Sequence, residues 1–371
     1  MRIGIDIRML SMLSDRAGLY QHTYNLVSNL LKINHENDYL LLSTSHGPDL
    51  EGIPEKNLLK LPAKITVLLL EKLSLPVELL TGRLDIFHGP FFFVPRCLNC
   101  KSIVTVHDLM ALRHPDFLIP ESEYFFKKRL KAAKRADAVI AVSDFTKKEI
   151  VELLKIEEGR IRVIHNGINR SFRPMEDGAM IEVVKAKYGI RGHYFLFVGN
   201  IEPKKNIESL LRACALLRRS TNFRYPLLIV GKKAWWFKSV WKIVQNLQAE
   251  KETIFTDVVD NNELPYLYSG AELFIFPSLF EGFGMPVIEA MACGTPVVAS
   301  NRSSIPEIAG DAALLVDPLN IDGIAEAMYN LLSDQYLKKR LVEKGLKRAM
   351  AFSWEKAVRE TLELYREVAR Q

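Results

Sequence analysis

The chain has few cysteines, and their spacing excludes two classes of protein. Its 371 residues include four cysteines, too few for a disulfide framework at this length. Cys97 and Cys100 form a CxxC pair, but Cys214 and Cys293 stand alone. The second pair that a zinc site of this type requires is therefore missing. We interpret all four cysteines as ordinary reduced thiols of a cytosolic protein.

Long apolar runs are also missing. The longest candidate, Ile65 to Leu70, ends at Glu71 and Lys72, far short of the ~18 residues that a membrane-spanning helix needs. The first ten residues carry charges inside their apolar stretch and lack a small-residue cleavage site, so we expect no secretion signal. The sequence thus predicts a cytoplasmic protein.

Several signatures of other enzyme classes are absent. No GxGxxG follows a predicted strand, which argues against an NAD or FAD site, and no GxxxxGK[ST] predicts a P-loop NTPase. GxSxG is missing, so a serine hydrolase has no support. No His, Cys or Asp cluster has metal-ligand spacing. We therefore expect no metal at the site.

Net charge is mildly positive and unevenly distributed. The chain holds 50 Lys and Arg against 44 Asp and Glu, a formal charge of +6. Residues 1–173 hold 25 basic and 20 acidic side chains, whereas residues 174–371 hold 25 and 24. Such an excess fits an acidic ligand or an anionic membrane surface. It is too weak to indicate nucleic-acid binding, for which no motif is present.

Strand-like and helix-like segments alternate, which predicts an α/β protein with parallel sheets. In the first half, strands are predicted at 3–7, 39–42, 86–88, 102–106 and 138–142, with helices at 20–31, 122–136 and 145–154. After a linker at 169–177, strands are predicted at 194–199, 227–231, 253–255, 273–276, 295–299 and 313–316. The chain ends in predicted helices at 321–333, 335–350 and 354–369. Because ligands of open α/β sheets bind beyond the carboxyl ends of the strands, we examined the loops that follow them.

The loop after the strand ending near Phe276 has the composition of an anion site. Gly282 and Gly284 allow the backbone to bend sharply and to approach a ligand. Pro286 suits the first position of a helix, and Gly294 suits the residue just beyond its end. The N–H groups and the dipole of such a helix favour a phosphate.

Charged residues accompany this loop. Glu289, one turn into the helix, could accept hydrogen bonds from two neighbouring ribose hydroxyls, and Glu281 could bind a sugar hydroxyl. A second loop holds Lys204 and Lys205 beside Asn206, the predicted N-cap of a helix over 207–217. Two lysines beside a helix N-terminus form a strong anion site. For the loop with Glu281 and Glu289, the alternative is a tight strand–helix turn that carries two surface acids. For the loop with Lys204 and Lys205, the alternative is a solvated basic turn.

Fewer candidates lie in the first half. His107 follows a strand and would face the cleft between the halves, where it could bind a substrate hydroxyl or stabilise developing charge. A structural histidine is the alternative, and His88 is a similar but weaker candidate. The loop at 16–20 has one glycine, Gly18, where a phosphate cradle would have two or more.

Together these segments resemble the family 4 retaining glycosyltransferases, which have the GT-B fold. Residues 281–289 resemble the family's E-x7-E signature, 199–206 its phosphate loop, and 163–168 its VIPNGVD segment. The resemblance covers nearly the whole chain. It implies two Rossmann-like parallel-sheet domains facing each other across a cleft. Residues 1–173, completed by the C-terminal helix 354–371, would bind the acceptor, and residues 174–353 would bind the nucleotide sugar.

The resemblance also implies a role for each candidate. Lys204 and Lys205 would bind the donor diphosphate, Glu289 the ribose, and Glu281 with the backbone N–H groups of Phe283, Gly284 and Met285 the donor sugar. His107 would contact the transferred sugar near its reacting face, and Gly18 would lie against the donor phosphates from the opposite domain. Two departures from the family pattern are Asn200, where many members have arginine, and Tyr20, where a second glycine is common.

The implied activity is retaining transfer of a hexose from a nucleotide diphosphate sugar to a glycan or lipid-linked acceptor, without metal. Within the family the chain looks most like the mannosyl- and other hexosyltransferases of polysaccharide assembly. Mannose from GDP-mannose is therefore the first choice, and UDP-glucose and related donors remain open. The alternatives are another GT-B-like enzyme, such as a phosphorylase or a nucleotide-sugar epimerase, and a non-catalytic nucleotide-sugar-binding protein.

The segment 124–135 combines aromatic side chains with six basic residues. We hypothesise that it touches an anionic membrane, which would place the protein at the inner membrane face. The alternative is a solvated amphipathic helix that packs its apolar side inward.

Overall fold

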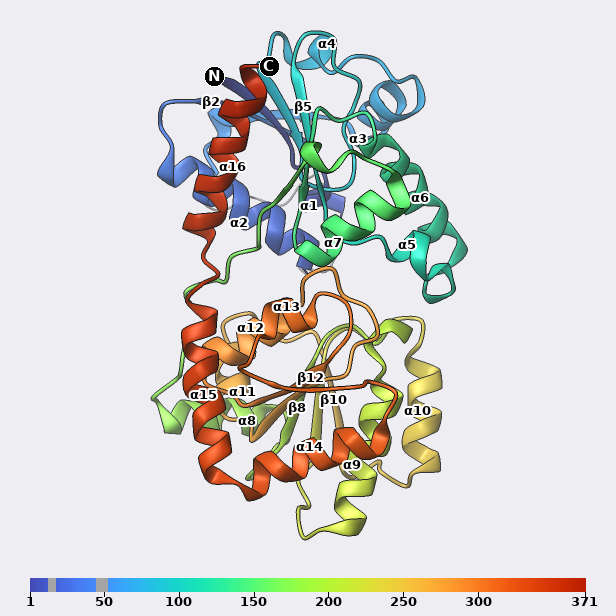
Figure 1. The fold of residues 1–371 in the computed structure, drawn as a ribbon, viewed down its shortest axis with the longest axis vertical. Helices are drawn as coiled ribbons and strands as arrows, with labels where there is room; N and C mark the ends of the chain where they lie inside the picture. Colours follow the sequence, from blue (N-terminus) through green and yellow to red (C-terminus); the bar gives the residue numbers. More distant parts are fainter. Residues whose placement is uncertain (13–17, 45–52) are drawn as a thin grey trace. The chain divides into compact units, whose positions relative to one another are not determined.

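The computed structural model describes residues 1–12, 18–44 and 53–371, which form two compact units (Figure 1). Met1–Gly167 and Ser353–Gln371 make up the first unit, and Ile168–Phe352 make up the second. Each unit contains one sheet in which every strand pair is parallel, with helices packed on it. The predicted pair of Rossmann-like parallel-sheet domains is confirmed.

The first unit has a seven-stranded sheet in the order β3-β2-β1-β4-β5-β6-β7. Its strands are β1 (Arg2–Asp6), β2 (Asp38–Thr44), β3 (Leu58–Leu61), β4 (Ile86–Gly89), β5 (Lys101–Val106), β6 (Ala138–Ala141) and β7 (Ile161–Val163). Its α-helices are α1 (Met9–Met12), α2 (Gly18–Ile33), α3 (Ala63–Thr66), α4 (Glu78–Thr81), α5 (Met110–Arg113), α6 (Pro120–Ala133), α7 (Asp144–Glu149) and α16 (Trp354–Ala369). The edge strand β3 was not predicted.

The second unit has a six-stranded sheet in the order β10-β9-β8-β11-β12-β13. Its strands are β8 (Phe195–Val198), β9 (Leu227–Val230), β10 (Thr253–Asp257), β11 (Leu273–Phe276), β12 (Val297–Ser300) and β13 (Leu314–Val316). Its α-helices are α8 (Gly178–Lys187), α9 (Ile207–Ser220), α10 (Phe237–Asn246), α11 (Leu264–Ser269), α12 (Met285–Ala292), α13 (Ile305–Ala309), α14 (Ile321–Ser333) and α15 (Gln335–Ala349). Strands β9, β11 and β12 are buried along their whole length, which explains their apolar sequences.

The boundary between the units lies at 167/168, six residues before the position inferred from the linker composition. Gly167 belongs to the first unit, where a Cβ atom would come within 2.1 Å of the backbone nitrogen of Trp354. Ile168 already belongs to the second unit, and its N–H donates to the carbonyl of Phe352. The polar stretch that follows therefore packs on the second unit instead of linking the two.

The C-terminal helix α16 returns to the first unit and packs beside α2 (Figure 1). Tyr365 on this helix is fully buried, and its hydroxyl lies 2.7 Å from Nδ1 of His88. Nε2 of His88 lies 2.9 Å from the hydroxyl of Thr105, and burial lowers the pKa of His88 to about 3. His88 is thus a structural histidine that joins β4 to α16 rather than a site residue.

Two further features of the described residues bear on the predictions. No helix among them combines the length and the apolar character that crossing a membrane requires. All four cysteines have free thiols.

Candidate active site

The lysine loop and the Glu281 loop leave neighbouring strands of the second sheet. Strands β8 and β11 pair with each other in the middle of this sheet. Strands β9 and β10 lie beyond β8 on one side, and β12 and β13 lie beyond β11 on the other. At such a switch point the loops that leave the carboxyl ends diverge, and the resulting crevice is where ligands of this sheet type bind. The topology therefore brings the two predicted anion loops to one edge of the sheet.

Lys205 and Glu281 form a buried ion pair between these loops. Lys205 Nζ lies 2.5 Å from Glu281 Oε1, and each residue is 8% exposed. The hydroxyl of Ser278 lies 2.6 Å from the same carboxylate oxygen. Burial opposes ionisation of Glu281, but Lys205, Lys204 and the hydrogen bonds outweigh it, so the pKa of Glu281 is lowered. The site thus presents an ionised carboxylate between two lysines and a serine.

Backbone contacts fix the two loops against each other. The N–H of Leu279 donates to the carbonyl of Lys204 over 2.7 Å. The hydroxyl of Ser304, fully buried, lies 2.9 Å from the carbonyls of Glu281 and Phe283. A third loop joins them at Gly231, where a Cβ atom would come within 2.2 Å of the carbonyl oxygen of Gly199. The loops after β8, β9 and β11 are therefore held as one rigid surface.

Helix α12 begins at this surface. Gly284 precedes it with a φ of +103°, and a Cβ atom there would meet Ile305 at 2.5 Å, so the position requires glycine. Pro286 lies in the first turn, and Gly294 follows the helix end with a φ of +74°, as predicted. The first N–H groups of a helix have no acceptor inside it, and Met285 begins α12 next to Gly284.

Glu289 lies one turn into α12 with a partly exposed side chain. The hydroxyl of Tyr268 donates to Glu289 Oε2 over 2.9 Å. Burial raises the pKa of Glu289 to about 7, against the opposing effect of this hydrogen bond. Glu289 therefore changes its charge near neutral pH, unlike Glu281.

Asn206 is the N-cap residue of α9, as predicted, but its side chain does not make the capping hydrogen bond. Its backbone is left-handed, with a φ of +53°, and its side chain accepts no hydrogen bond from the helix. The side-chain amide donates instead to the carbonyls of Pro277 and Pro318. Asn206 thus ties the lysine loop to the Glu281 loop, a long-range role that its place before a helix could not reveal.

In the first unit, His107 follows β5 and is partly exposed. Its Nε2 lies 2.8 Å from the carbonyl oxygen of Pro90, and because a carbonyl only accepts, Nε2 carries the proton. Burial lowers the pKa of His107, so the ring is neutral at pH 7 with Nδ1 as an acceptor. The ring of His22 packs edge-on against it at 4.5 Å, and His22 Nδ1 lies 2.8 Å from Asn166 Oδ1.

Gly18 is the first residue of α2 and is exposed. A Cβ atom there would meet no atom within 4 Å, so packing does not require glycine at this position. Residues 16 and 17 of the same predicted loop lie outside the described residues. The role assigned to Gly18 by resemblance stays a prediction.

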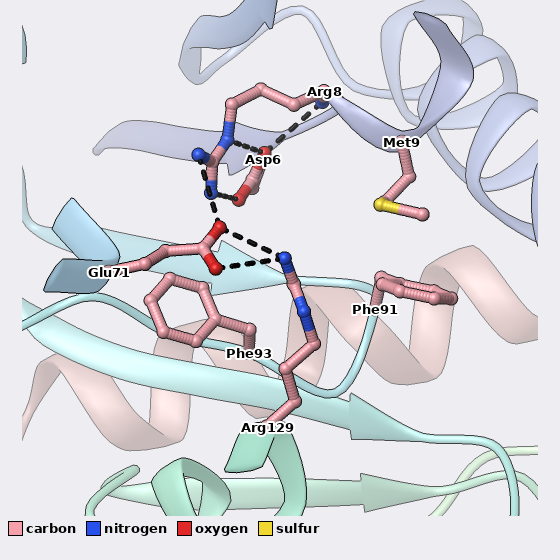
Figure 2. A pocket seen from close by; sticks show the side chains of 7 residues that line it. All are labelled: Asp6, Arg8, Met9, Glu71, Phe91, Phe93 and Arg129. Carbon is pink, nitrogen blue, oxygen red and sulfur yellow. Dashed lines mark hydrogen bonds and ion pairs between the residues drawn. The ribbon is translucent and has the colours of Figure 1, made fainter. Parts of the chain in front are cut away.

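A buried charge network occupies the corresponding switch point of the first sheet, between β1 and β4 (Figure 2). Glu71 lies between the guanidinium groups of Arg8 and Arg129, and Arg8 also pairs with Asp6 at 2.6 Å. The cavity that these residues line has a volume of about 10 Å³, room for a single water molecule. This cavity is therefore too small to hold a sugar.

Seven predicted donor residues thus gather in the second unit, and two lie in the first. The seven lie in or beside the loops that follow β8 and β11: Lys204, Lys205, Glu281, Phe283, Gly284, Met285 and Glu289. In the first unit, His107 follows β5 and Gly18 is the first residue of α2. Sequence reasoning missed Ser278, Tyr268, Gly231 and His22. The glycine directly after β9 was a signal for Gly231, but the partners of the other three come from distant segments.

Two family profiles match the chain and together cover most of it. The profile described as "Glycosyltransferase Family 4" matches residues 17–172, and the profile described as "Glycosyl transferases group 1" matches residues 181–348. The match to the second profile contains the complete lysine and Glu281 loops.

Named relatives are similar in sequence. The chain is 34% identical over 283 residues to O-antigen chain mannosyltransferase B of Escherichia coli, covering 76% of this chain and 74% of that protein. It is 30% identical over 259 residues to the serotype-specific mannosyltransferase WbdA of Escherichia coli, covering 68% of this chain. That alignment spans only 32% of WbdA. A solved structure, sucrose-phosphate synthase from Thermosynechococcus elongatus, has the same fold, with a TM-score of 0.77 at 21% identity over 99% of this chain and 98% of that one.

The buried pair between Lys205 and Glu281 predicts a strong energetic coupling. Lys205→Met should lower the free energy of unfolding by about 3–5 kcal/mol, because it leaves an ionised carboxylate buried with one partner fewer. Adding Glu281→Gln should recover at least about 1 kcal/mol of this loss. Urea unfolding followed by tryptophan fluorescence reports mainly on the second unit, which holds Trp235, Trp236 and Trp241.

The matched control is Lys344→Met. Lys344 pairs with Asp311 at the same distance of 2.5 Å, but the Asp311 side chain is 81% exposed. This change should cost less than about 1 kcal/mol. If the Lys205 and Glu281 substitutions change the free energy of unfolding additively, the predicted coupling is contradicted.

Proposed function

This chain belongs to the family 4 glycosyltransferases, and we propose that it transfers mannose from GDP-mannose to a glycan or lipid-linked acceptor with retention of anomeric configuration. The O-antigen mannosyltransferases among its relatives support mannose as the hexose. The observation that carries the proposal is the Lys205–Glu281 pair at the β8–β11 switch point, beside the N-terminus of α12. It combines positive charge for a diphosphate with a fixed carboxylate for a sugar hydroxyl.

The chemistry needs stabilisation of a leaving group. As the bond between the anomeric carbon and the diphosphate breaks, negative charge builds on the phosphate oxygens. In this proposal Lys204, Lys205 and the N-terminus of α12 neutralise that charge. In the front-face route that we propose, the departing phosphate oxygen takes the acceptor hydroxyl proton while that hydroxyl oxygen bonds to the anomeric carbon. The same positive groups would fill the role that a metal ion has in other transferases.

His107 has a defined part in this proposal. Because Nε2–H donates to the carbonyl of Pro90, the neutral ring offers Nδ1 as an acceptor. His107 would therefore accept a hydrogen bond from a hydroxyl of the transferred sugar instead of delivering a proton. The edge-on ring of His22 holds it in that orientation.

Transfer should depend on both the acceptor and Lys205. The assay offers GDP-, UDP-, dTDP- and ADP-sugars with a mannose-containing oligosaccharide acceptor and no added divalent metal. The wild type should release nucleoside diphosphate from GDP-mannose, and only when the acceptor is present. Lys205→Ala should cut turnover at least about 100-fold, because it removes a preorganised charge at the leaving group. Lys242→Ala, an exposed lysine on α10, should leave turnover unchanged.

Three outcomes would contradict this proposal. Cleavage that requires inorganic phosphate would indicate a phosphorylase, and conversion of the donor without any acceptor would indicate an epimerase or a hydrolase. Binding of the donor with no turnover across the acceptor panel would indicate a binding protein.

Donor affinity should depend on pH through Glu289. If the ribose hydroxyls bind the ionised carboxylate, protonation near the pKa of about 7 weakens binding as pH falls. The Kd for GDP-mannose, measured by calorimetry, should rise about tenfold from pH 8 to pH 6. Glu289→Gln should bind more weakly at pH 8 and show a flat profile. A wild-type Kd that is equally flat would contradict the ribose role.

We further propose that α6 of the first unit contacts an anionic membrane. Tyr124, 72% exposed, and the exposed Lys128 and Lys131 lie at helical spacing on one face, and Lys134 follows directly after the helix end. Arg129, counted with the basic surface from sequence, is buried: it pairs with Glu71 and stacks on Phe125. The remaining basic face pairs an aromatic side chain with lysines, as membrane-surface helices do.

Liposome co-sedimentation should detect this contact. Binding to vesicles containing anionic phospholipid should exceed binding to neutral vesicles, and Lys128→Gln, Lys131→Gln and Lys134→Gln together should weaken it roughly 100-fold, at about 1 kcal/mol per lysine. The control triple variant Lys56→Gln, Lys72→Gln and Lys148→Gln removes three exposed lysines elsewhere on the same unit. An equal loss of vesicle binding in the two triple variants would contradict the contact. Equal binding of the wild type to anionic and neutral vesicles would contradict it as well.

A further inference from the structure

Glu78, Cys97 and Cys100 meet at the edge of the first sheet opposite to His107. Glu78 is the first residue of α4, and Cys100 directly precedes β5, whereas His107 follows that strand. The two segments are joined by a hydrogen bond of 2.9 Å from the N–H of Val77 to the carbonyl of Arg96. The fold thus brings a carboxylate to a CxxC pair from about twenty residues away in the chain.

The carboxylate of Glu78 is held in a fixed orientation. Its Oε1 accepts hydrogen bonds from the backbone N–H groups of Leu98, Asn99 and Cys100 at 2.8, 2.9 and 3.1 Å. Its Oε2 is shielded from solvent and, in the part of the chain that the structure describes, accepts no hydrogen bond from a nitrogen or a hydroxyl group. The thiol of Cys100 hydrogen-bonds to the Glu78 carboxylate, and a cation bound to both groups would take the place of that thiol proton.

The two sulfur atoms complete a set of metal-binding groups. One oxygen of Glu78 and the Sγ atoms of Cys97 and Cys100 all lie within 4.8 Å of one another. Ligand atoms around a tetrahedral zinc ion are roughly 3.3–3.8 Å apart, given bonds of about 2.0–2.3 Å. A movement of about 1 Å in the side chains would therefore close the set around an ion.

We propose that Cys97, Cys100 and Glu78 bind a zinc-type divalent cation. Binding would replace the two thiol protons, which leave to solvent, with two metal–thiolate bonds and one metal–carboxylate bond, and water would fill the fourth position. Two thiolates favour a soft or borderline ion over Mg²⁺ or Ca²⁺. The sequence has no second cysteine pair to complete such a site, and the fold supplies the carboxylate of Glu78 instead.

The position of the cluster fits a structural role. Cys97 is partly exposed and Leu98 and Asn99 are exposed, so an ion can enter from solvent, whereas Cys100 is buried among apolar side chains. At about 3.3 Å per residue, β5 separates Cys100 from His107 by about 20 Å. The ion would fasten the 96–100 loop to α4 and stay away from the sugar chemistry, so this proposal does not depend on the transfer reaction.

Cobalt substitution of the full chain tests the proposal. Protein purified under reducing conditions and stripped of metal should bind one equivalent of Co²⁺ with a thiolate-to-metal absorption band, and Zn²⁺ should displace the band. Zn²⁺ should also raise the thermal midpoint of the stripped protein. Cys97→Ser with Cys100→Ser should abolish the band, and Glu78→Gln should weaken Co²⁺ binding at least about tenfold, since even outer-shell partners of a metal change affinity about 10–100-fold.

The controls separate metal binding from folding. Glu78→Gln keeps an oxygen acceptor for the three N–H groups, and so it should fold. Cys214→Ser with Cys293→Ser removes two buried cysteines of the second unit and should keep the full band. A wild type without a thiolate band under reducing conditions, a disulfide between Cys97 and Cys100 in place of metal uptake, or equal Co²⁺ affinity in Glu78→Gln would overturn the proposal.

Discussion

The buried ion pair between Lys205 and Glu281 holds together the loops that leave β8 and β11, and the candidate donor site depends on it. The two strands are neighbours at the point where the strand order reverses, so their loops would otherwise diverge. The amide of Asn206 reinforces the junction by donating to the carbonyl of Pro277, and the N–H of Leu279 donates to the carbonyl of Lys204. A diphosphate that binds Lys205 would compete with Glu281, and part of the donor's binding energy would then reorganise this pair.

Two carboxylates of the second unit, Glu281 and Glu289, have pKa values that are shifted in opposite directions. Lys205 and Lys204 lower the pKa of Glu281, whereas Glu289 accepts a hydrogen bond from the Tyr268 hydroxyl and burial raises its pKa to about 7. The first is a permanent charge suited to a sugar hydroxyl close to the diphosphate. The second gains full charge only above neutral pH.

Sequence patterns predicted the parts of the fold that depend on local periodicity. The bounds of α14 and α16 match the predicted helices, because apolar spacing and capping residues define both ends. The edge strand β3 was missed, since four residues without strict alternation carry little signal. Roles set by distant partners were also missed or wrong: the amide of Asn206 reaches Pro318, Arg129 pairs with Glu71, and Glu78 joins Cys97. Long-range contacts of this kind depend on topology, which residue spacing does not encode.

A structure of the protein bound to GDP-mannose would test the central claim most directly. The diphosphate oxygens should lie within hydrogen-bonding distance of Lys205 Nζ and of the first N–H groups of α12, and the ribose hydroxyls should contact the carboxylate of Glu289. A nucleotide bound at another edge of the second sheet, or a diphosphate remote from Lys205, would contradict the account.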